Sequence, residues 1–253
     1  MNEIEITIEA GKSKRLLTKG KLCDENIVVT AEGGVDRYEE GVTDGKQQAY
    51  DTFWDSHQRN GTQQNYSAFF AGRTWTEETL CPKYDIVPTN AYQMFYICGA
   101  DSNPIDLTSA LKVKLDFSKA TNIDNVFQGA NISRVGVIDV TSCGASITAV
   151  FANASLHTID EFVIKTDGSQ SFGNSFSGCS SLENLTIKGT IGKTFTINNS
   201  ARLSSKSVQS IIDHLKDLTG TTAQTLTLHR NVGAKLTEEQ KATITAKNWA
   251  LVY

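Results

Sequence analysis

The chain has 253 residues, of which 39% are hydrophobic and 21% charged, and its formal net charge is −4. This length allows one or two domains with a substantial core. The mild negative charge gives no general attraction to nucleic acid or to an anionic membrane, and no apolar stretch approaches the ~20 residues that span a bilayer. We therefore expect neither a nucleic-acid partner nor membrane insertion.

The first 36 residues are predicted to form a β attachment segment. Residues 3–9 alternate between polar and apolar types, and residues 26–30 are a β-branched run, so both are expected as strands. The basic stretch between them is either a solvated hairpin edge, where lysine discourages stray strand pairing, or a docking surface for an acidic partner. The candidate docking residues are Lys12, Lys14 and Arg15.

Residues 37–92 are predicted as a helix-containing transition that covers the start of the next region. Within it, residues 44–59 have an apolar face at helical spacing, formed by Tyr50, Phe53, Trp54 and His57. Such an aromatic stripe is typical of a face packed on a core, and the alternative is a platform for stacking sugars.

A short phrase then recurs around three phenylalanines, Phe127, Phe151 and Phe176, which are 24 and 25 residues apart. A diverged first copy is expected at Phe95, 32 residues before Phe127. A fixed period of 20–30 residues predicts stacked units that share one core and leave a long outer surface for binding. Residues 93–200 are therefore predicted as a solenoid of about three to five repeats.

Short apolar or β-branched runs follow the phrases and are expected as strands: 135–138, 162–164 and 185–187, with later ones at 195–197 and 226–228. The predicted repeat core consists of Phe95, Cys98, Phe127, Phe151, Phe176, Cys179, Leu182 and Leu185. Polar positions that alternate with buried ones in a strand face outward. On this basis the predicted ligand-facing residues are Thr186, Lys188 and Thr196.

Residues 201–253 are predicted as a C-terminal α/β cap. Apolar residues from Val208 to Leu218 recur at helical spacing, with Ser204 as N-cap and Gly220 as the end. A second helix is expected at Thr237, which forms a capping box with Gln240. A last strand is expected around residues 249–251.

The residues that usually carry chemistry are sparse. The five cysteines lack C-x-x-C spacing, and Cys98 and Cys179 are expected to be buried and reduced. Two glycine-lysine-hydroxyl triplets lack the earlier glycine that a phosphate-binding loop requires. The neighbouring carboxylates Asp101 and Asp106, and Glu238 and Glu239, are interpreted as turn and helix-start residues. A glycosidase pair remains an alternative, since such pairs are assembled from distant sequence. We expect no enzyme activity, no cofactor and no metal site.

The segment Phe176–Ile187 resembles the repeat of BspA-type leucine-rich-repeat proteins. Residues 203–251 and 14–30 resemble the two ends of repeat proteins encoded in phage and prophage tail modules of Gram-positive gut bacteria. The resemblance implies a β-rich α+β fold, with a short leucine-rich-repeat-like β-solenoid between an N-terminal β segment plus helix and a C-terminal α/β cap. It also implies a virion structural protein, such as a tail fibre, baseplate or head fibre component, that binds the host surface. The alternative is a bacterial surface adhesin of the same repeat family.

The N-terminal sequence lacks the basic and apolar regions of a secretory signal. We therefore expect the protein to be made in the host cytoplasm and released in virions by lysis, the alternative location being the bacterial cell surface. The expected partners are other virion proteins, further copies of this chain in a symmetric homo-oligomer, and a host surface glycan or protein.

Overall fold

The computed structural model describes residues 58–75, 80, 82–99 and 103–253. All of them belong to one compact unit that spans Tyr50–Tyr253. The predicted β segment and its basic docking residues lie outside the described residues, as does nearly all of the helix predicted at 44–59. Of that helix, Gln58 lies in a turn and Arg59 begins the short 3-10 helix η1 (Arg59–Gly61).

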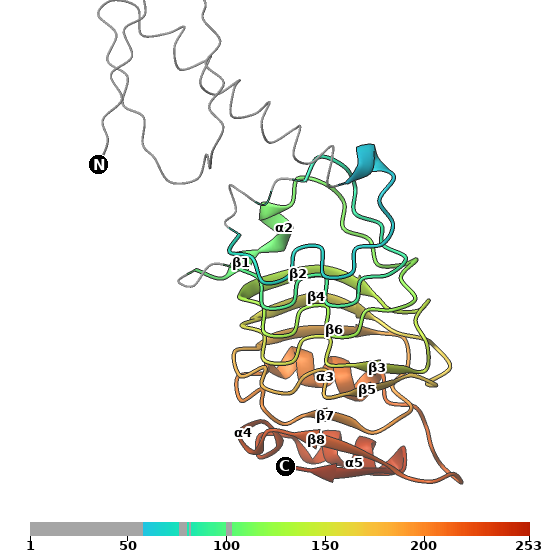
Figure 1. Ribbon diagram of the computed structural model, residues 1–253. Coiled ribbons are helices and arrows are strands. Elements are labelled where there is room, and N and C mark those ends of the chain that lie inside the picture. Colours follow the sequence, from blue (N-terminus) through green and yellow to red (C-terminus); the bar gives the residue numbers. More distant parts are fainter. Residues whose placement is uncertain (1–57, 76–79, 81, 100–102) are drawn as a thin grey trace, which may run out of the picture. The chain divides into compact units, whose positions relative to one another are not determined.

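The described strands are short and lie in three separate parallel sheets (Figure 1). The first sheet has four strands in the order β1 (Ile105–Asp106), β2 (Ile132–Asp139), β4 (Thr158–Val163) and β6 (Asn184–Lys188). The second pairs β3 (Ser146–Thr148) with β5 (Ser171–Gly173). The third has the order β7 (Phe195–Ile197), β8 (Gln224–Leu228) and β9 (Trp249–Val252). The strands predicted after the phenylalanine phrases and near the end of the chain are confirmed.

In the described residues, four α-helices accompany the sheets: α2 (Leu107–Ala110), α3 (Ser205–Asp213), α4 (Arg230–Gly233) and α5 (Glu238–Ala246). The predicted caps are confirmed, since Ser204 accepts from the N–H of Ser207, and Thr237 and Gln240 form a reciprocal capping box. The predicted end of the first C-terminal helix at Gly220 is wrong. The chain leaves α3 early because Leu215 forms a parallel bridge with Ile191, and it reaches the same core in extended backbone.

Helix α3 covers the open edge of β6. The Oγ of Ser207 accepts from the N–H of Leu185 at 2.8 Å, and the Oγ of Ser210 accepts from the N–H of Ile187 at 2.9 Å. An uncovered strand edge leaves unpaired N–H groups that invite pairing with other chains. Two serine side chains therefore take the place of a neighbouring strand.

Five seven-residue segments share one turn geometry. In each, the fifth residue is a buried phenylalanine, and the third and seventh residues have positive φ angles between +49° and +72°. We name these the turn segments: 66–72, 91–97, 123–129, 147–153 and 172–178. The repeated phrase predicts four of them. It misses the segment around Phe70, because that phrase ends in Arg73 instead of a small residue.

Neighbouring turn segments are joined by backbone hydrogen bonds, and we name the resulting structure the turn ladder. The third, fifth and seventh N–H groups of one segment donate to carbonyls of the next; Phe95 N donates to Val126 O, and Phe127 N to Val150 O, both at 2.8 Å. The sixth N–H groups, and the fourth in four of the five segments, instead close β-turns within their own segment, as from Val126 N to Ile123 O. The exception is Val150 N, which donates to the Oγ of Ser175 at 3.5 Å. The geometry therefore provides partners for backbone donors that would otherwise be buried unpaired.

The phenylalanines of the turn ladder stack on one another. The ring centroids of Phe95 and Phe127 lie 5.3 Å apart with 12° between the planes, and those of Phe127 and Phe151 lie 5.8 Å apart with 4° between the planes. Phe70 stacks on Phe95, and Phe176 tilts by 36° against Phe151. Each such pair contributes about 0.5–1.5 kcal/mol beyond the burial of its area.

The predicted fold class, a β-rich α+β chain with a leucine-rich-repeat-like β-solenoid, is wrong. The described strands contain only two to eight residues, lie in three separate parallel sheets and form no solenoid. Register shifts interrupt the β1–β2 and β4–β6 pairings. The even spacing of the phenylalanines also breaks where α2 occupies the longer interval between Phe95 and Phe127. The spacing of the phenylalanines specifies the stacking of the turns, but it does not place the strands in one continuous sheet.

Candidate binding surface

The turn ladder separates positions that build the core from positions that are displayed. In each turn segment the first, fourth and fifth residues are buried, except for the partly exposed Phe69. The second and seventh positions are exposed or partly exposed in every segment, and the residue type changes from one segment to the next. The second positions are Ser67, Tyr92, Asp124, Thr148 and Gly173. The fifth residue is phenylalanine in every segment, whereas the displayed second residue differs in each, so a common support carries a variable set of outer side chains.

The structure does not bring the three predicted ligand-facing residues together. Thr186 and Lys188 lie on β6 in the four-stranded sheet, whereas Thr196 lies on β7 in the three-stranded sheet. Lys188 and Thr196 are exposed and Thr186 is partly exposed. The alternation of each strand predicted the outward direction, but the sheet to which a strand belongs depends on pairing that no local pattern records.

The eight residues predicted for the repeat core are all buried within one continuous apolar cluster. They are Phe95, Cys98, Phe127, Phe151, Phe176, Cys179, Leu182 and Leu185. The basic docking candidates Lys12, Lys14 and Arg15 lie outside the described residues. These eight residues therefore form part of the support beneath the surface of the described chain.

Charges on the four-stranded sheet are largely paired with one another. Arg134 binds both carboxylate oxygens of Asp160, with nitrogen–oxygen distances of 3.0 and 3.1 Å. Lys188 lies 3.9 Å from a carboxylate oxygen of Glu161. These pairs link neighbouring strands, and exposed pairs of this kind contribute only about 0–1 kcal/mol to stability. Their mutual neutralisation leaves this face without a strong field of one sign.

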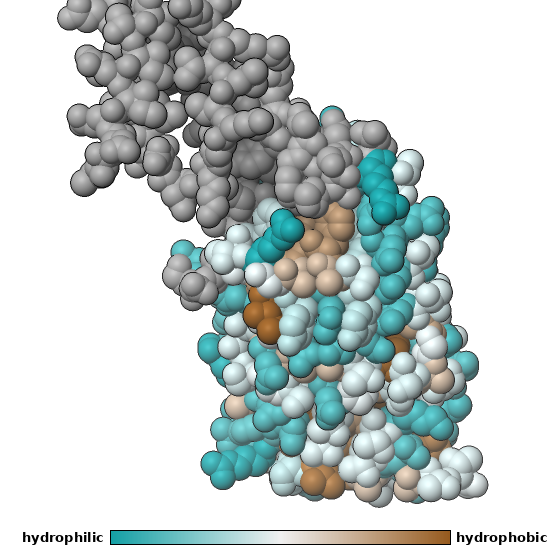
Figure 2. Space-filling model, in the orientation of Figure 1, coloured by the Kyte–Doolittle hydropathy of each residue, from teal (hydrophilic) through white to brown (hydrophobic). Residues whose placement is uncertain are grey.

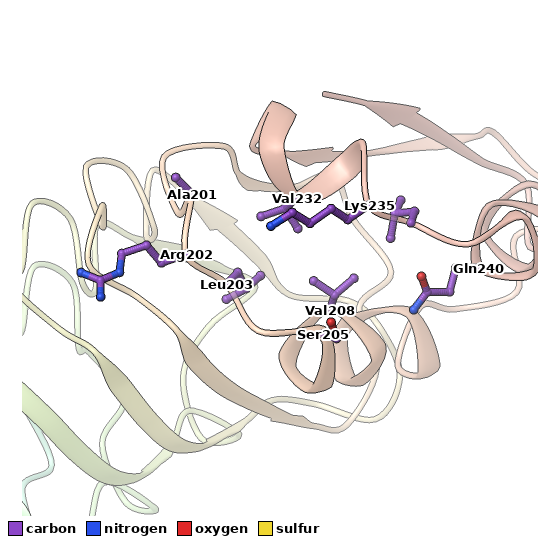
Figure 3. A pocket seen from close by; sticks show the side chains of 9 residues that line it. Ala201, Arg202, Leu203, Ser205, Val208, Val232, Lys235 and Gln240 are labelled. Carbon is purple, nitrogen blue, oxygen red and sulfur yellow. The ribbon is translucent and has the colours of Figure 1, made fainter.

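A small pocket lies between the loop before α3, the helices α3 and α4, and the start of α5 (Figure 3). Its volume is about 110 Å³. Leu203, Val208 and Val232 contribute apolar groups, and the cations Arg202 and Lys235 line it as well. The guanidinium of Arg202 is already paired with Glu183 at 2.6 Å. The remaining space suits at most a small group, well below the ~300 Å³ of typical ligand sites.

A second hollow, of about 150 Å³, lies where α2 interrupts the even spacing of the phenylalanines. Leu107, Leu111 and Val113 line one side, and Gly136 and Val137 of β2 line the other. Strand β1 has only two residues and pairs with the first part of β2 alone, so the rest of that edge faces α2. The hollow is apolar, and Val137 is 49% exposed beside it.

The described cysteines are poor nucleophiles. Burial raises the pKa of Cys98, Cys143 and Cys179 to about 12, and all three are free thiols. The Sγ of Cys179 donates to the carbonyl of Phe151 at 3.0 Å. Because the reactive species is the thiolate, these residues act as small packing groups at neutral pH. The prediction of buried, reduced cysteines at positions 98 and 179 is confirmed.

Asp106 and Glu238, two of the carboxylates predicted at turns and helix starts, have local structural contacts. Asp106 caps α2 by accepting from the N–H and hydroxyl of Thr108, and Glu238 pairs with Lys241 at 2.9 Å. Asp101 lies outside the described residues. Within the described ranges, no group of three or more histidine, cysteine, aspartate or glutamate side chains is placed to hold a metal ion.

The comparisons with known proteins identify no relative. No family model, no curated protein and no solved structure matches the chain. In the part of the chain that the structure describes, no helix is long and apolar enough to cross a membrane. Figure 2 shows a mostly hydrophilic face with isolated apolar patches.

Proposed function

We propose that this chain is a structural protein of a bacteriophage or prophage virion, such as a tail fibre, baseplate or head fibre component, that presents the turn ladder to the host surface. The observation that carries the proposal is that each turn segment buries a phenylalanine at its fifth position and displays at its second position a side chain that differs from segment to segment. Binding proteins built from stacked units use such extended outer surfaces. The resemblance of the chain ends to phage tail-module proteins supports the same role.

In this role the chain works by binding and not by catalysis. The stacked phenylalanines and the backbone bonds between turn segments hold the displayed side chains on a rigid support. Rigid support reduces the entropy lost on binding. A symmetric homo-oligomer, attached to other virion proteins, would present several copies of the surface, so that weak individual contacts combine into strong attachment.

Immunogold electron microscopy of particles from the source strain tests the proposal, using an antibody raised against this chain. We expect gold at one fixed place on the virion, either head or tail. Gold on cell envelopes, with unlabelled particles in the same preparation, would contradict the proposal and favour a bacterial surface adhesin. Particles from a strain that lacks the gene serve as the control for antibody specificity.

A further inference from the structure

The second turn segment carries an exposed group of large side chains, Tyr92, Tyr96 and Ile97, which we name the tyrosine ridge. Tyr92 is 38% exposed and Ile97 is 54% exposed, and Tyr96 is partly exposed. The N–H of Tyr92 donates to the side chain of Asn90 at 3.0 Å, which fixes the start of the turn. The three side chains therefore project from one short and well-defined stretch of backbone.

The neighbouring turn segments have smaller side chains at the ridge positions. The ladder places Ile97 between Gly72 and Gly129, and Tyr96 is bonded through its carbonyl to Gly72. The γ1 carbon of Ile97 lies only 3.2 Å from the place where a Cβ on Gly129 would stand. Glycine at position 129 thus leaves room for the isoleucine. The ridge side chains are therefore larger than those at the equivalent positions of both neighbouring segments.

Ile97 has a backbone conformation that is unfavourable for its residue type. Its φ angle is +49°, and the other four turn segments have glycine or asparagine at this position. Positive φ is a genuine outlier for a β-branched residue. With half of the side chain exposed, burial does not compensate for this strain. Strained residues retained on a surface are typical of functional sites.

The polar groups around the ridge point to the class of ligand. Neither tyrosine hydroxyl, nor the side-chain amide of Gln93, has a hydrogen-bond partner within the described residues. Tyrosine combines an apolar ring face with a hydroxyl that can donate and accept, and the negative face of the ring attracts weakly positive C–H groups. A sugar ring offers both an apolar C–H face and hydroxyl groups. A protein partner usually needs ~20–30 residues on each side, far more than one turn segment provides.

We propose that the tyrosine ridge binds a pyranose glycan, with sugar C–H faces against its exposed side chains and sugar hydroxyls bonded to the tyrosine hydroxyls and Gln93. This inference rests on the proposed function, since it names the ligand class of the host-binding surface. It assigns that binding to the second turn segment, away from the predicted positions Thr186, Lys188 and Thr196.

An array of defined oligosaccharides of glucose, galactose, rhamnose, N-acetylglucosamine and N-acetylgalactosamine tests the proposal. The full chain is biotinylated and tetramerised on streptavidin, because single sugar sites are weak. We expect the wild-type chain to bind a defined subset of these glycans, and Tyr92→Ala and Tyr96→Ala to weaken that binding at least tenfold. Tyr253→Ala, which removes another half-exposed tyrosine, is the matched control and should leave binding unchanged.

Ile97→Asn separates recognition from folding. Asparagine tolerates positive φ and stands at the equivalent position 153 of the ladder, so we expect an unchanged or higher midpoint of thermal unfolding together with at least a tenfold loss of glycan binding. Ridge variants that bind as well as the wild type would overturn the proposal. A wild-type chain that labels virions but binds no glycan would also overturn it, while leaving the proposed function intact.

Discussion

The turn ladder and the C-terminal region, residues 198–253, provide hydrogen-bond partners for backbone groups in different ways. In the turn segments, backbone N–H groups donate to carbonyls of the next segment, so each segment depends on its neighbours. The C-terminal region uses the capped helices α3 and α5, whose end groups find partners within a few residues. Damage to one turn segment should therefore spread to its neighbours in the ladder, whereas the helix ends of the C-terminal region need no neighbouring segment for their caps.

Phe127→Ala should produce the largest effect, because it removes a ring that contacts Phe95, Phe117 and Phe151 at once. We expect the free energy of unfolding to fall by about 3–5 kcal/mol. Urea denaturation followed by tryptophan fluorescence and by circular dichroism measures it. The half-exposed Val137→Ala is the control, with an expected change below about 1 kcal/mol. A similar loss in both variants would contradict the central role of the stack.

Gly189→Ala tests how closely the backbone is packed next to β6. The φ angle of Gly189 is +104°, and an added Cβ would lie 2.1 Å from the carbonyl oxygen of Ile164. We expect a loss of about 2–4 kcal/mol in the same denaturation experiment. Gly220→Ala, with positive φ but open space around it, should cost about 1 kcal/mol. Gly144→Ala, with neither constraint, should be neutral or slightly stabilising.

Ser207→Ala tests the junction between the two regions. It removes the hydroxyl that accepts from Leu185 N and leaves that donor buried without a partner. We expect a loss of about 1–3 kcal/mol, and faster amide hydrogen exchange at Leu185. Ser205→Ala, two residues earlier at the first position of the same helix, should leave exchange at Leu185 unchanged. Unchanged exchange in the Ser207 variant would refute the idea that α3 seals the edge of β6.

Acidification should produce the smallest change in the free energy of unfolding. It should also distinguish two similar turns, those at Asp116 and Asp217. The hydrogen bond from Lys114, aided by those from Ser118, lowers the pKa of Asp116 to about 2. A depressed folded pKa means that the stabilisation is complete above about pH 4 and is lost as the pH falls toward 2. Asp116→Asn should remove less than about 1 kcal/mol at pH 7, because its partner Lys114 is largely exposed to solvent. The difference from wild type should shrink on acidification from pH 4 to 2; a constant difference would contradict this account.

Asp217 in the C-terminal region is the matched comparison. It accepts from the N–H and the hydroxyl of Thr219, and the bond from that hydroxyl is the main cause that lowers its pKa. It has no lysine hydrogen-bonded to it in the described chain. We therefore expect a weaker pH dependence for Asp217→Asn than for Asp116→Asn, measured by thermal unfolding at a series of pH values.

Local patterns in the sequence determined much of the internal structure. The spacing of Phe127, Phe151 and Phe176 predicted residues that stack, and the β-branched runs after them predicted β2, β4 and β6. The helix caps at Ser204 and Thr237 were also predictable. The caps depend on residues close in sequence, and the stack follows because the same local unit recurs every 24 or 25 residues.

Only the tertiary structure decided which strands share a sheet. For this reason the predicted solenoid was wrong, and the predicted ligand-facing residues lie on two different sheets. It also decided the role of Ser207, because a serine on a helix gives no local sign that it bonds to a distant strand. The tyrosine ridge also follows from contacts between segments that are distant in sequence. Ile97 becomes distinctive only when the ladder sets it between Gly72 and Gly129, which lie 25 and 32 residues away in the chain. Such positions follow from hydrogen bonding and packing between segments remote in sequence, which local periodicity does not encode.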